Sequence, residues 1–378
     1  MTLIAKRVMA LAVAVCATVL AGCGGDPVSS APAAIADPVG LNNDVASLST
    51  PLQGSVFQSF STLGSTSPIS GRTTTVLSAM TPSRLALLSR QGVTPKQALA
   101  LKSLRPSFAT APTGAGSLIP ETQWGKVYVW DTGTHAYVEG SATGGPATGV
   151  RFTLYAIDPL TNQPATPLNA IGYADLTDES TDTDYRLGVL VASETATYAD
   201  YLVTATSTQT SFQAVAAGYV TDGAHRLDFN NSASASSNHI AVDFDLTLDH
   251  PDVAAHLHAD LTAGDPTTVL SLTLSVTRGG ETVALAGTVG FTTSQSGASA
   301  VANLVVTVNG RQFATITGTV TSNSAAGYTF TGPDRDLTAQ ERNALNQMMA
   351  APAVLTAAAA PMFTAAEQLI GSSYSLGL

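Results

Sequence analysis

The sequence predicts a mainly β protein: a large antiparallel meander sheet, curved or two-layered, covered by helices from both ends of the chain. Three observations predict this fold. About a dozen segments between residues 121 and 332 alternate apolar and polar side chains with the period of a strand. The links between them are short and carry no helical pattern, so successive strands must pair antiparallel. Helical patterns flank this region on both sides and can cover the sheet.

Composition and periodicity divide the 378 residues into five segments. The β domain contains two tight-turn signals, Arg278-Gly279-Gly280 and Asn309-Gly310. A Gly-, Pro-, Ser- and Ala-rich stretch near the start has the composition of a flexible linker. We therefore expect a signal peptide at 1–22, a flexible tether at 23–40, a helical or irregular basic segment at 41–120, an antiparallel β domain at 121–332, and C-terminal helices packed on that domain at 333–378.

The helical signals before the β domain are of two kinds. Residues 44–63 are compatible with a helix. Thr81-Pro82 and Thr94-Pro95 each place a capping residue before a proline at the first helical position, which predicts two short helices.

Capping and proline positions predict two helices after the β domain. Thr338 and Glu341 have the spacing of a capping box. Pro352 is expected to end the helix that begins there, because proline removes a backbone hydrogen bond and clashes with the preceding turn. A second, Ala-rich helix is expected at 353–370, with a break near Pro361.

The N-terminus has the form of an export signal. Lys6 and Arg7 precede an apolar run at residues 8–20, which is too short to remain as a membrane span. The run ends in Leu20-Ala21-Gly22-Cys23, which closely resembles the lipobox of bacterial lipoproteins. The alternative is an ordinary signal peptide that happens to end near a cysteine.

The lipobox resemblance covers only the first 23 residues and implies a location. It implies removal of the signal at Cys23 and attachment of acyl chains, palmitate among them, to that residue. Gly24 rather than Asp follows the cysteine, which by the sorting pattern of such lipoproteins implies the outer membrane. Cys16 lies within the signal, so the mature chain would keep no thiol for a disulfide, a cysteine nucleophile or a Cys zinc site.

Charge argues against nucleic acid as a partner, because the formal net charge is −11. The charge is unevenly distributed. Residues 40–125 hold six basic and two acidic residues, whereas the chain after Lys126 holds seven Arg and 23 acidic residues. Either the basic segment docks on the acidic remainder, or the two surfaces are solvated independently.

The pattern richest in potential metal-ligating side chains is a predicted hairpin at residues 239–261. Large apolar residues take every second position on each arm, which predicts one buried and one solvated face. With a turn at 249–252, Leu248 faces Val253, Asp245 faces His256 and Asp243 faces His258. The solvated face then carries Asp243, Asp245, His256, His258 and Asp260.

Three interpretations of this solvated face remain open. It is a ladder of Asp–His pairs that supports register and solubility, a divalent-metal site for zinc, copper or nickel, or a pH-responsive patch. A second candidate is the acidic run between two strands, where crowded oxygen ligands suit calcium although the spacing differs from the twelve-residue calcium loop. That run consists of Asp175, Asp178, Glu179, Asp182 and Asp184, and the alternative for it is a solvated loop.

Nothing in the sequence predicts a catalytic residue. The chain has no Gly-x-Ser-x-Gly elbow, phosphate-binding loop, dinucleotide fingerprint or His-Glu-x-x-His motif. Trp124, Tyr128, Trp130 and Tyr137 cluster in the first hairpin, either as a sugar- or lipid-binding surface or as core packing.

These patterns favour a lipid-anchored envelope protein with a binding or structural role and no cofactor. Its expected partners are the membrane, through the acyl chains, and either an apolar small molecule held between sheet and helices or another envelope protein. The apolar-ligand variant rests on a fold-level analogy with lipoprotein carriers. The alternative is a metal-dependent envelope hydrolase or metal-binding protein that uses the His/Asp face.

Overall fold

We describe a computed structural model that places residues 33–66, 117–182, 184–208, 210–264, 267–294, 297–321 and 328–370. The helices predicted from Thr81 and Thr94, and the six basic residues of the 41–120 segment, lie outside these described residues. Cys23 also lies outside them.

Strands dominate the described residues, and fifteen of them form one sheet. The strands of this sheet are β1 (Lys126–Asp131), β2 (Ala136–Thr143), β3 (Gly149–Tyr155), β6 (Ala170–Asp178), β7 (Tyr185–Ala192), β8 (Thr197–Ser207), β9 (Ser211–Thr221), β10 (Arg226–Ser236), β11 (His239–Leu248), β12 (Val253–Thr262), β13 (Thr267–Arg278), β14 (Glu281–Ser294), β15 (Gly297–Val308), β16 (Arg311–Thr321) and β17 (Thr329–Thr331). A separate two-stranded ribbon consists of β4 (Ile157–Asp158) and β5 (Gln163–Pro164).

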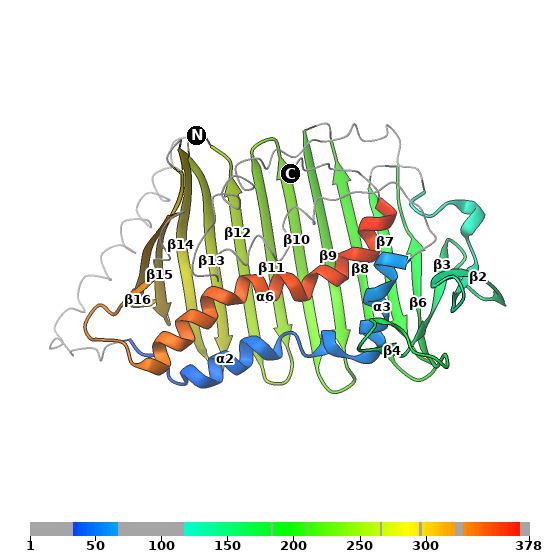
Figure 1. Cartoon of the computed structure of the whole chain (residues 1–378), viewed down its shortest axis with the longest axis horizontal. Coiled ribbons are helices and arrows are strands. Elements are labelled where there is room, and N and C mark those ends of the chain that lie inside the picture. Colours follow the sequence, from blue (N-terminus) through cyan, green and yellow to red (C-terminus); the bar gives the residue numbers. More distant parts are fainter. Residues whose placement is uncertain are drawn as a thin grey trace, which may run out of the picture. The chain divides into compact units, whose positions relative to one another are not determined.

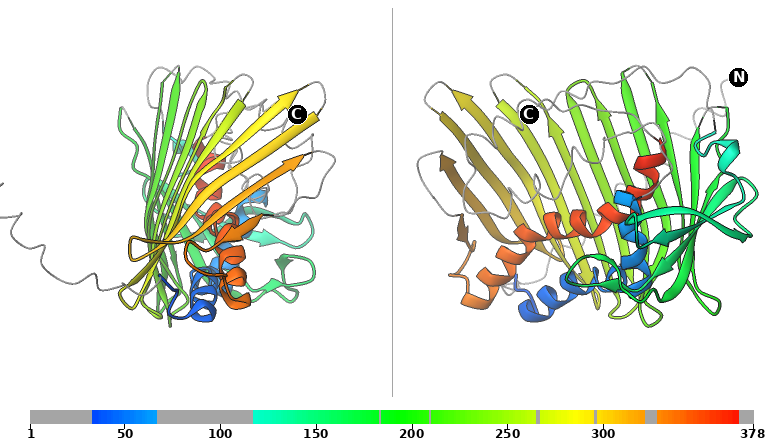
Figure 2. Two further views of the ribbon diagram at one scale, coloured as in Figure 1. Left: turned by 90° about the vertical axis from the view of Figure 1, so that its left-hand side faces the viewer. Right: turned by 45° about the vertical axis from the view of Figure 1, so that its right-hand side comes forward.

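The sheet is a single open layer in the order β17-β16-β15-β14-β13-β12-β11-β10-β9-β8-β7-β6-β3-β1-β2. From β6 onward each strand pairs antiparallel with the next one in sequence, which confirms the predicted meander. The prediction of purely antiparallel pairing is wrong at one place. Strand β2 folds outward to the sheet edge, so β3 returns beside β1 and pairs with it in parallel. The strands at the two ends of the sheet are rotated relative to each other, as twist requires (Figure 2).

The hairpin turns follow the predicted chemistry. Asn309 and Gly310 have φ angles of 50° and 76°, and Gly279 and Gly280 have 54° and 83°. Positive φ at both central positions matches the right-handed twist of the flanking strands. The Asn309 side chain also accepts a hydrogen bond of 2.8 Å from the Thr282 backbone N–H.

Two helices and a 3₁₀ turn precede the sheet: α2 (Pro38–Ser47), η1 (Pro51–Gln53) and α3 (Ser55–Thr66). Asp37 caps α2 by accepting a hydrogen bond of 2.9 Å from the Gly40 N–H. Ile35 is already buried, so ordered packing starts before residue 40, the predicted end of the tether. The single helix predicted at 44–63 is divided, because η1 begins at Pro51 and interrupts it. A second 3₁₀ turn, η3 (Glu121–Gln123), precedes β1.

The C-terminal helix α6 (Ala339–Ile370) begins at the predicted capping box. The Glu341 carboxylate accepts from the Thr338 N–H at 2.8 Å, and the Glu341 N–H donates to the Thr338 hydroxyl at 3.2 Å. The predicted break at Pro352 is wrong, because α6 continues through both Pro352 and Pro361. Packing offsets the backbone hydrogen bonds that proline removes. Among the described helices, none has a long enough apolar stretch to cross a bilayer.

All three helices lie on one face of the sheet, and α6 contacts both α2 and α3 (Figures 1 and 2). We call this the covered face. It holds the predicted buried side chains of β11, from Ile240 to Leu248 at every second position, together with Leu345 and Met348 of α6. No helix of the described residues lies on the opposite face, which we call the open face (Figure 2).

Candidate functional site

The β11–β12 hairpin has the register that the sequence predicts. Leu248 is paired with Val253, Asp245 with His256, and Asp243 with His258. The large apolar side chains of both strands are buried on the covered face, and the Asp and His side chains lie on the open face. The period-two pattern therefore predicted both the pairing and the direction of each side chain.

Two of the opposed pairs are hydrogen-bonded. His256 Nδ1 lies 2.6 Å from Asp245 Oδ1, and His258 Nδ1 lies 2.5 Å from Asp243 Oδ1. The four side chains are between 39% and 56% exposed, so water screens each pair. Among the described residues, the other ring nitrogen of each histidine, Nε2, has no hydrogen-bond partner.

Sequence reasoning missed a third pair on this face. His239 Nε2 is hydrogen-bonded to Asp260 Oδ2. The two residues are diagonal rather than opposed, because His239 pairs with Thr262 across the strands. The signal was available, since His239 has the same parity as Asp243 and Asp245 and must share their face.

These six side chains form three separate pairs. The described residues contain no group of three or more His, Cys, Asp or Glu side chains placed to hold a metal ion. Each imidazole has one carboxylate within hydrogen-bonding distance, which is the arrangement of the predicted Asp–His ladder. Metal binding by Asp243, Asp245, His256, His258 and Asp260 stays a prediction.

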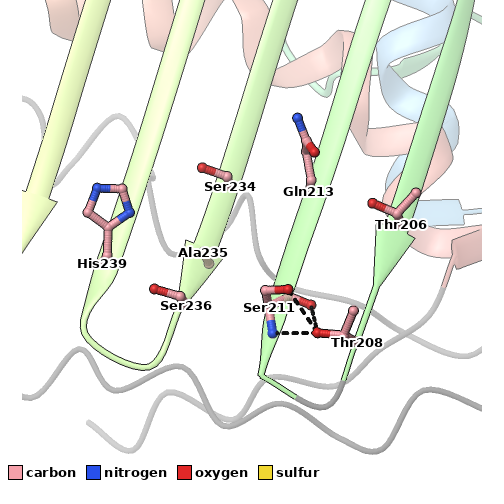
Figure 3. Close-up of a pocket in the computed structure, with 8 residues that line it drawn as sticks. All are labelled: Thr206, Thr208, Ser211, Gln213, Ser234, Ala235, Ser236 and His239. Atoms are coloured by element: carbon pink, nitrogen blue, oxygen red, sulfur yellow. Dashed lines mark hydrogen bonds between the residues drawn. The ribbon is translucent and has the colours of Figure 1, made fainter.

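A shallow polar pocket of about 230 Å³ adjoins the His239–Asp260 pair on the open face. Figure 3 shows His239 on one side and Thr206 on the other, with Ser234 and Gln213 between them. The pocket draws its lining from β8 to β11, where short polar residues leave a hollow. Its lining residues are Thr206, Thr208, Ser211, Gln213, Ser234, Ala235, Ser236 and His239.

Part of this lining is already hydrogen-bonded and part is free. Thr208 and Ser211 pair through their hydroxyls at 2.8 Å and close the β8–β9 turn (Figure 3). Within the described part of the chain, Gln213, Ser234 and Ser236 have no side-chain hydrogen bond. These groups can donate to and accept from a polar uncharged ligand, with His239 beside them.

The pocket does not contain a charge relay. Ser236 is paired with His239 across β10 and β11, and Asp260 holds the imidazole from the other side. No hydrogen bond joins Ser234 or Ser236 to His239 in the described structure, whereas nucleophile activation requires that contact. The described lining of the pocket therefore offers hydroxyl, amide and imidazole groups for hydrogen bonding.

The acidic run is distributed along β6 and the loop that follows it, and its first members have separate partners. Both oxygens of Asp175 accept from Arg151, at 2.6 and 2.7 Å. Glu179 lies 3.9 Å from Arg186. Asp182 and Asp184 lie in the β6–β7 loop. Calcium binding by this run stays a prediction.

Asp178 attaches the segment before β1 to the β6–β7 loop. Its carboxylate accepts from the Ser117 hydroxyl at 2.6 Å, from the Ile119 N–H at 3.0 Å and from the Ser180 N–H at 3.0 Å. Burial opposes ionisation, but these hydrogen bonds outweigh it and lower the pKa of Asp178. In the described structure this carboxylate therefore connects two segments of the backbone.

Three of the four clustered aromatic residues pack in the core, whereas Trp124 is only half-buried and its indole N–H donates to the Ile119 carbonyl at 3.0 Å. Tyr128, Trp130 and Tyr137 are at most 5% exposed. Phe152 of β3 lies between the two tyrosines, with ring centroids at 5.2 and 5.3 Å. Core packing, one of the two predicted alternatives, explains these residues.

Three lining residues of the pocket that sequence reasoning missed, Ser234, Ala235 and Ser236, lie in the second half of β10. Strand β10 extends to Ser236. Residues 230–236 hold only Asn, Ser and Ala, so no alternation of large apolar residues marks them.

Comparisons of the chain with protein-family models, with curated proteins and with solved structures gave no match.

Proposed function

We propose that this protein is a lipid-anchored component of the bacterial cell envelope, of outer-membrane type, with a binding or structural role rather than a catalytic one. Acyl chains on Cys23 supply the anchor. The open face of the sheet supplies the binding surface, and its partner is another envelope protein or a polar ligand of the envelope.

One observation carries the binding role. All three described helices pack on the covered face, which leaves the open face of a fifteen-stranded sheet uncovered by any of them. That face carries paired His and Asp side chains and a pocket with free hydrogen-bonding groups. A broad polar surface with few apolar side chains suits recognition of polar partners.

The anchor is tested by fractionation and mass spectrometry. The wild-type protein should sediment with outer membranes, and its N-terminal peptide should begin at Cys23 and carry the mass of acyl chains. The Cys23→Ser variant should appear in the soluble fraction. An unmodified N-terminus, or a Cys23→Ser variant that stays in the membrane, sinks this proposal.

Binding at the open face is tested by site-specific photo-crosslinking in intact cells. A photoreactive residue at Gln213 or Ser234 should give a defined covalent adduct. Leu160 is a matched control because its side chain is 94% exposed and lies in the β4–β5 loop. Equal adduct patterns from all three positions contradict recognition at this face.

A variant of the proposal places an apolar ligand between sheet and helices. It rests on the helical cover of this face and on the fold-level analogy with lipoprotein carriers. Asn231 is a buried polar residue of this layer: its Nδ2 lies 3.7 Å from the Met362 sulfur of α6, and its Oδ1 has no hydrogen-bond partner within the described structure. Solvent extraction of the purified full chain tests the variant, because a bound apolar molecule should then be found by mass spectrometry.

The second candidate function is metal binding, with or without hydrolysis, at the His/Asp face. The three His–Asp pairs on two adjacent strands favour it. Zinc, nickel or copper should then raise the melting temperature by several degrees, and His256→Thr with His258→Thr should abolish that rise. An unchanged melting temperature with all three metals removes this candidate.

A further inference from the structure

Within strands β10–β16, the open face is divided into a charged half and an uncharged half. On β10–β12 it carries three His–Asp pairs and the Arg226–Asp228 pair. On β13–β16 the described side chains of this face are only Thr, Ser, Asn, Gln, Ala, Gly and Val. The charged residues of these four strands, Arg278, Glu281 and Arg311, lie at strand ends.

The uncharged half also holds the most exposed apolar side chains of the sheet strands. Val301 and Val305 of β15 are 50% and 36% exposed. They stand four residues apart on one strand, so both project from the open face. Val305 is paired with Thr315 on β16 and with Ala286 on β14, which surrounds it with small or β-branched neighbours.

Threonine hydroxyls at both ends of this half are satisfied within the sheet. Thr267 and Thr292 are joined through their hydroxyls at 3.1 Å, and Thr277 and Thr282 at 2.9 Å. A hydroxyl with a partner costs less to remove from water than a free one. The methyl groups of these residues can therefore be buried at a modest desolvation cost.

We propose that the open face of β13–β16 is a homodimer interface, in which two copies of the chain pack sheet against sheet. Aligned packing of two such faces about 10 Å apart is the ordinary arrangement of a β-sandwich. A two-fold axis through the patch makes it self-complementary, because each copy contributes the same residues.

Two properties of the patch point to a second copy as the occupant. The sequence has a net charge of −11, so copies repel each other wherever charged surfaces meet. On the uncharged half no like charges face each other. Its size also fits: four strands at about 4.8 Å spacing and about 3.4 Å rise over 12 residues give roughly 800 Å² per copy. That equals the area each partner buries in a standard interface, about 800 Å².

Sedimentation velocity of the detergent-solubilised full chain tests the interface. The wild-type protein should sediment as a dimer at micromolar concentration. The Val301→Lys, Val305→Lys double variant should dissociate, with self-association weakened by roughly 100-fold or more, because lysines from both copies meet without partners. Leu160→Lys, an apolar-to-charged change at an exposed position outside the patch, should remain dimeric.

A conservative crosslinking variant keeps the test independent of folding defects. The chain has only two native cysteines, Cys16 and Cys23, so a single added thiol gives a clear signal. Under mild oxidation, Val305→Cys should form a disulfide-linked dimer above the wild-type background, and Leu160→Cys should not. A monomeric wild-type protein, or a dimer that survives both lysines and gives no Val305→Cys crosslink, overturns the proposal.

Discussion

Arg278 Nε, at the end of β13, lies 2.8 Å from Asp44 Oδ2 of α2. The Asp44 side chain is 6% exposed, whereas Arg278 is 41% exposed. Burial raises the pKa of Asp44, and the Arg278 charge opposes that rise. Arg278 Nη1 also lies 3.1 Å from Asp37 Oδ2. Two acidic residues of the described N-terminal helical region thus contact Arg278 of the sheet, whereas docking through the basic residues stays a prediction, because those residues lie outside the described ones.

Removal of Arg278 should destabilise the protein through Asp44. Arg278→Met leaves a buried carboxylate without its partner, and we expect a loss of about 2 kcal/mol in the free energy of unfolding. Urea denaturation at pH 7 measures this loss.

The matched control for this pair is a double-mutant cycle. Asp44→Asn in the Arg278→Met background should recover part of the lost stability, because no buried charge remains. Additive losses in the double variant would show that the two side chains do not interact.

The capping box of α6 should contribute to stability in a pH-dependent way. Hydrogen bonds from Arg335 lower the pKa of Glu341 to about 2, and the Thr338 N–H and hydroxyl add to this. A carboxylate with a lowered pKa contributes stability that is fully present above its unfolded pKa, near 4.5. That contribution is lost as the pH falls toward 2.

Glu341→Gln should therefore cost about 2 kcal/mol at pH 7 and close to nothing near pH 2. The measurement is the difference in unfolding free energy between wild type and variant across this pH range. A difference that stays constant with pH would mean that the Glu341 charge is not what stabilises the helix start.

The two faces of the β11–β12 hairpin should respond differently to substitution. His256→Thr with His258→Thr removes exposed pairs, and the unfolding free energy should change by less than about 1 kcal/mol. Phe244→Ala on the covered face, where the side chain is 2% exposed, should cost about 3–5 kcal/mol. Unfolding of the histidine variant would mean that the open face is buried in the native protein.

Gly218 should tolerate no side chain, because of its position against Tyr201. A Cβ there would lie 2.3 Å from the Asp200 carbonyl oxygen and 2.4 Å from Tyr201 Cβ. Tyr201 is buried, packs on Phe229 and donates a hydrogen bond of 2.9 Å to the Met362 carbonyl of α6.

Gly218→Ala should therefore lower the melting temperature by several degrees, in line with about 1–3 kcal/mol for overpacking. Gly290→Ala is the control, since the nearest atom to its Cβ would be Thr267 Cγ2 at 3.7 Å. Equal effects of the two variants would show that the Tyr201 contact is not what limits Gly218.

The sequence predicted the sheet well where large apolar residues alternate with polar ones. The hairpin at Leu248 and Val253 followed from parity together with the predicted turn at 249–252. Residues 230–236 carry no such pattern, because the covered face holds Asn231, Ala233 and Ala235 there instead of large apolar side chains. Met362 of α6 contacts this small-residue region at Asn231, a distant contact with no trace in the local pattern. The same helix continues through Pro352 because tertiary packing overrides a local breaking signal.

The sequence predicted only part of the candidate site, because parity determines the face of a side chain but not its distant neighbours. Parity placed Asp243, Asp245, His256 and His258 on one face, and their partners followed from the turn. The His239–Asp260 pair is diagonal, and the pocket beside it combines residues from four strands. Such neighbours depend on strand order and on which face the helices cover, and the hydrophobic period determines neither.

The most direct measurement is thiol labelling of two adjacent alanines on β12 in isolated membranes. Ala254 is exposed on the open face, and Ala255 is 3% exposed on the covered face. With a water-soluble maleimide, Ala254→Cys should react rapidly in protein that sediments with the membrane, and Ala255→Cys should react only after unfolding. Equal protection of both thiols, or their recovery in the soluble fraction, would contradict a lipid-anchored protein that displays the open face of its sheet.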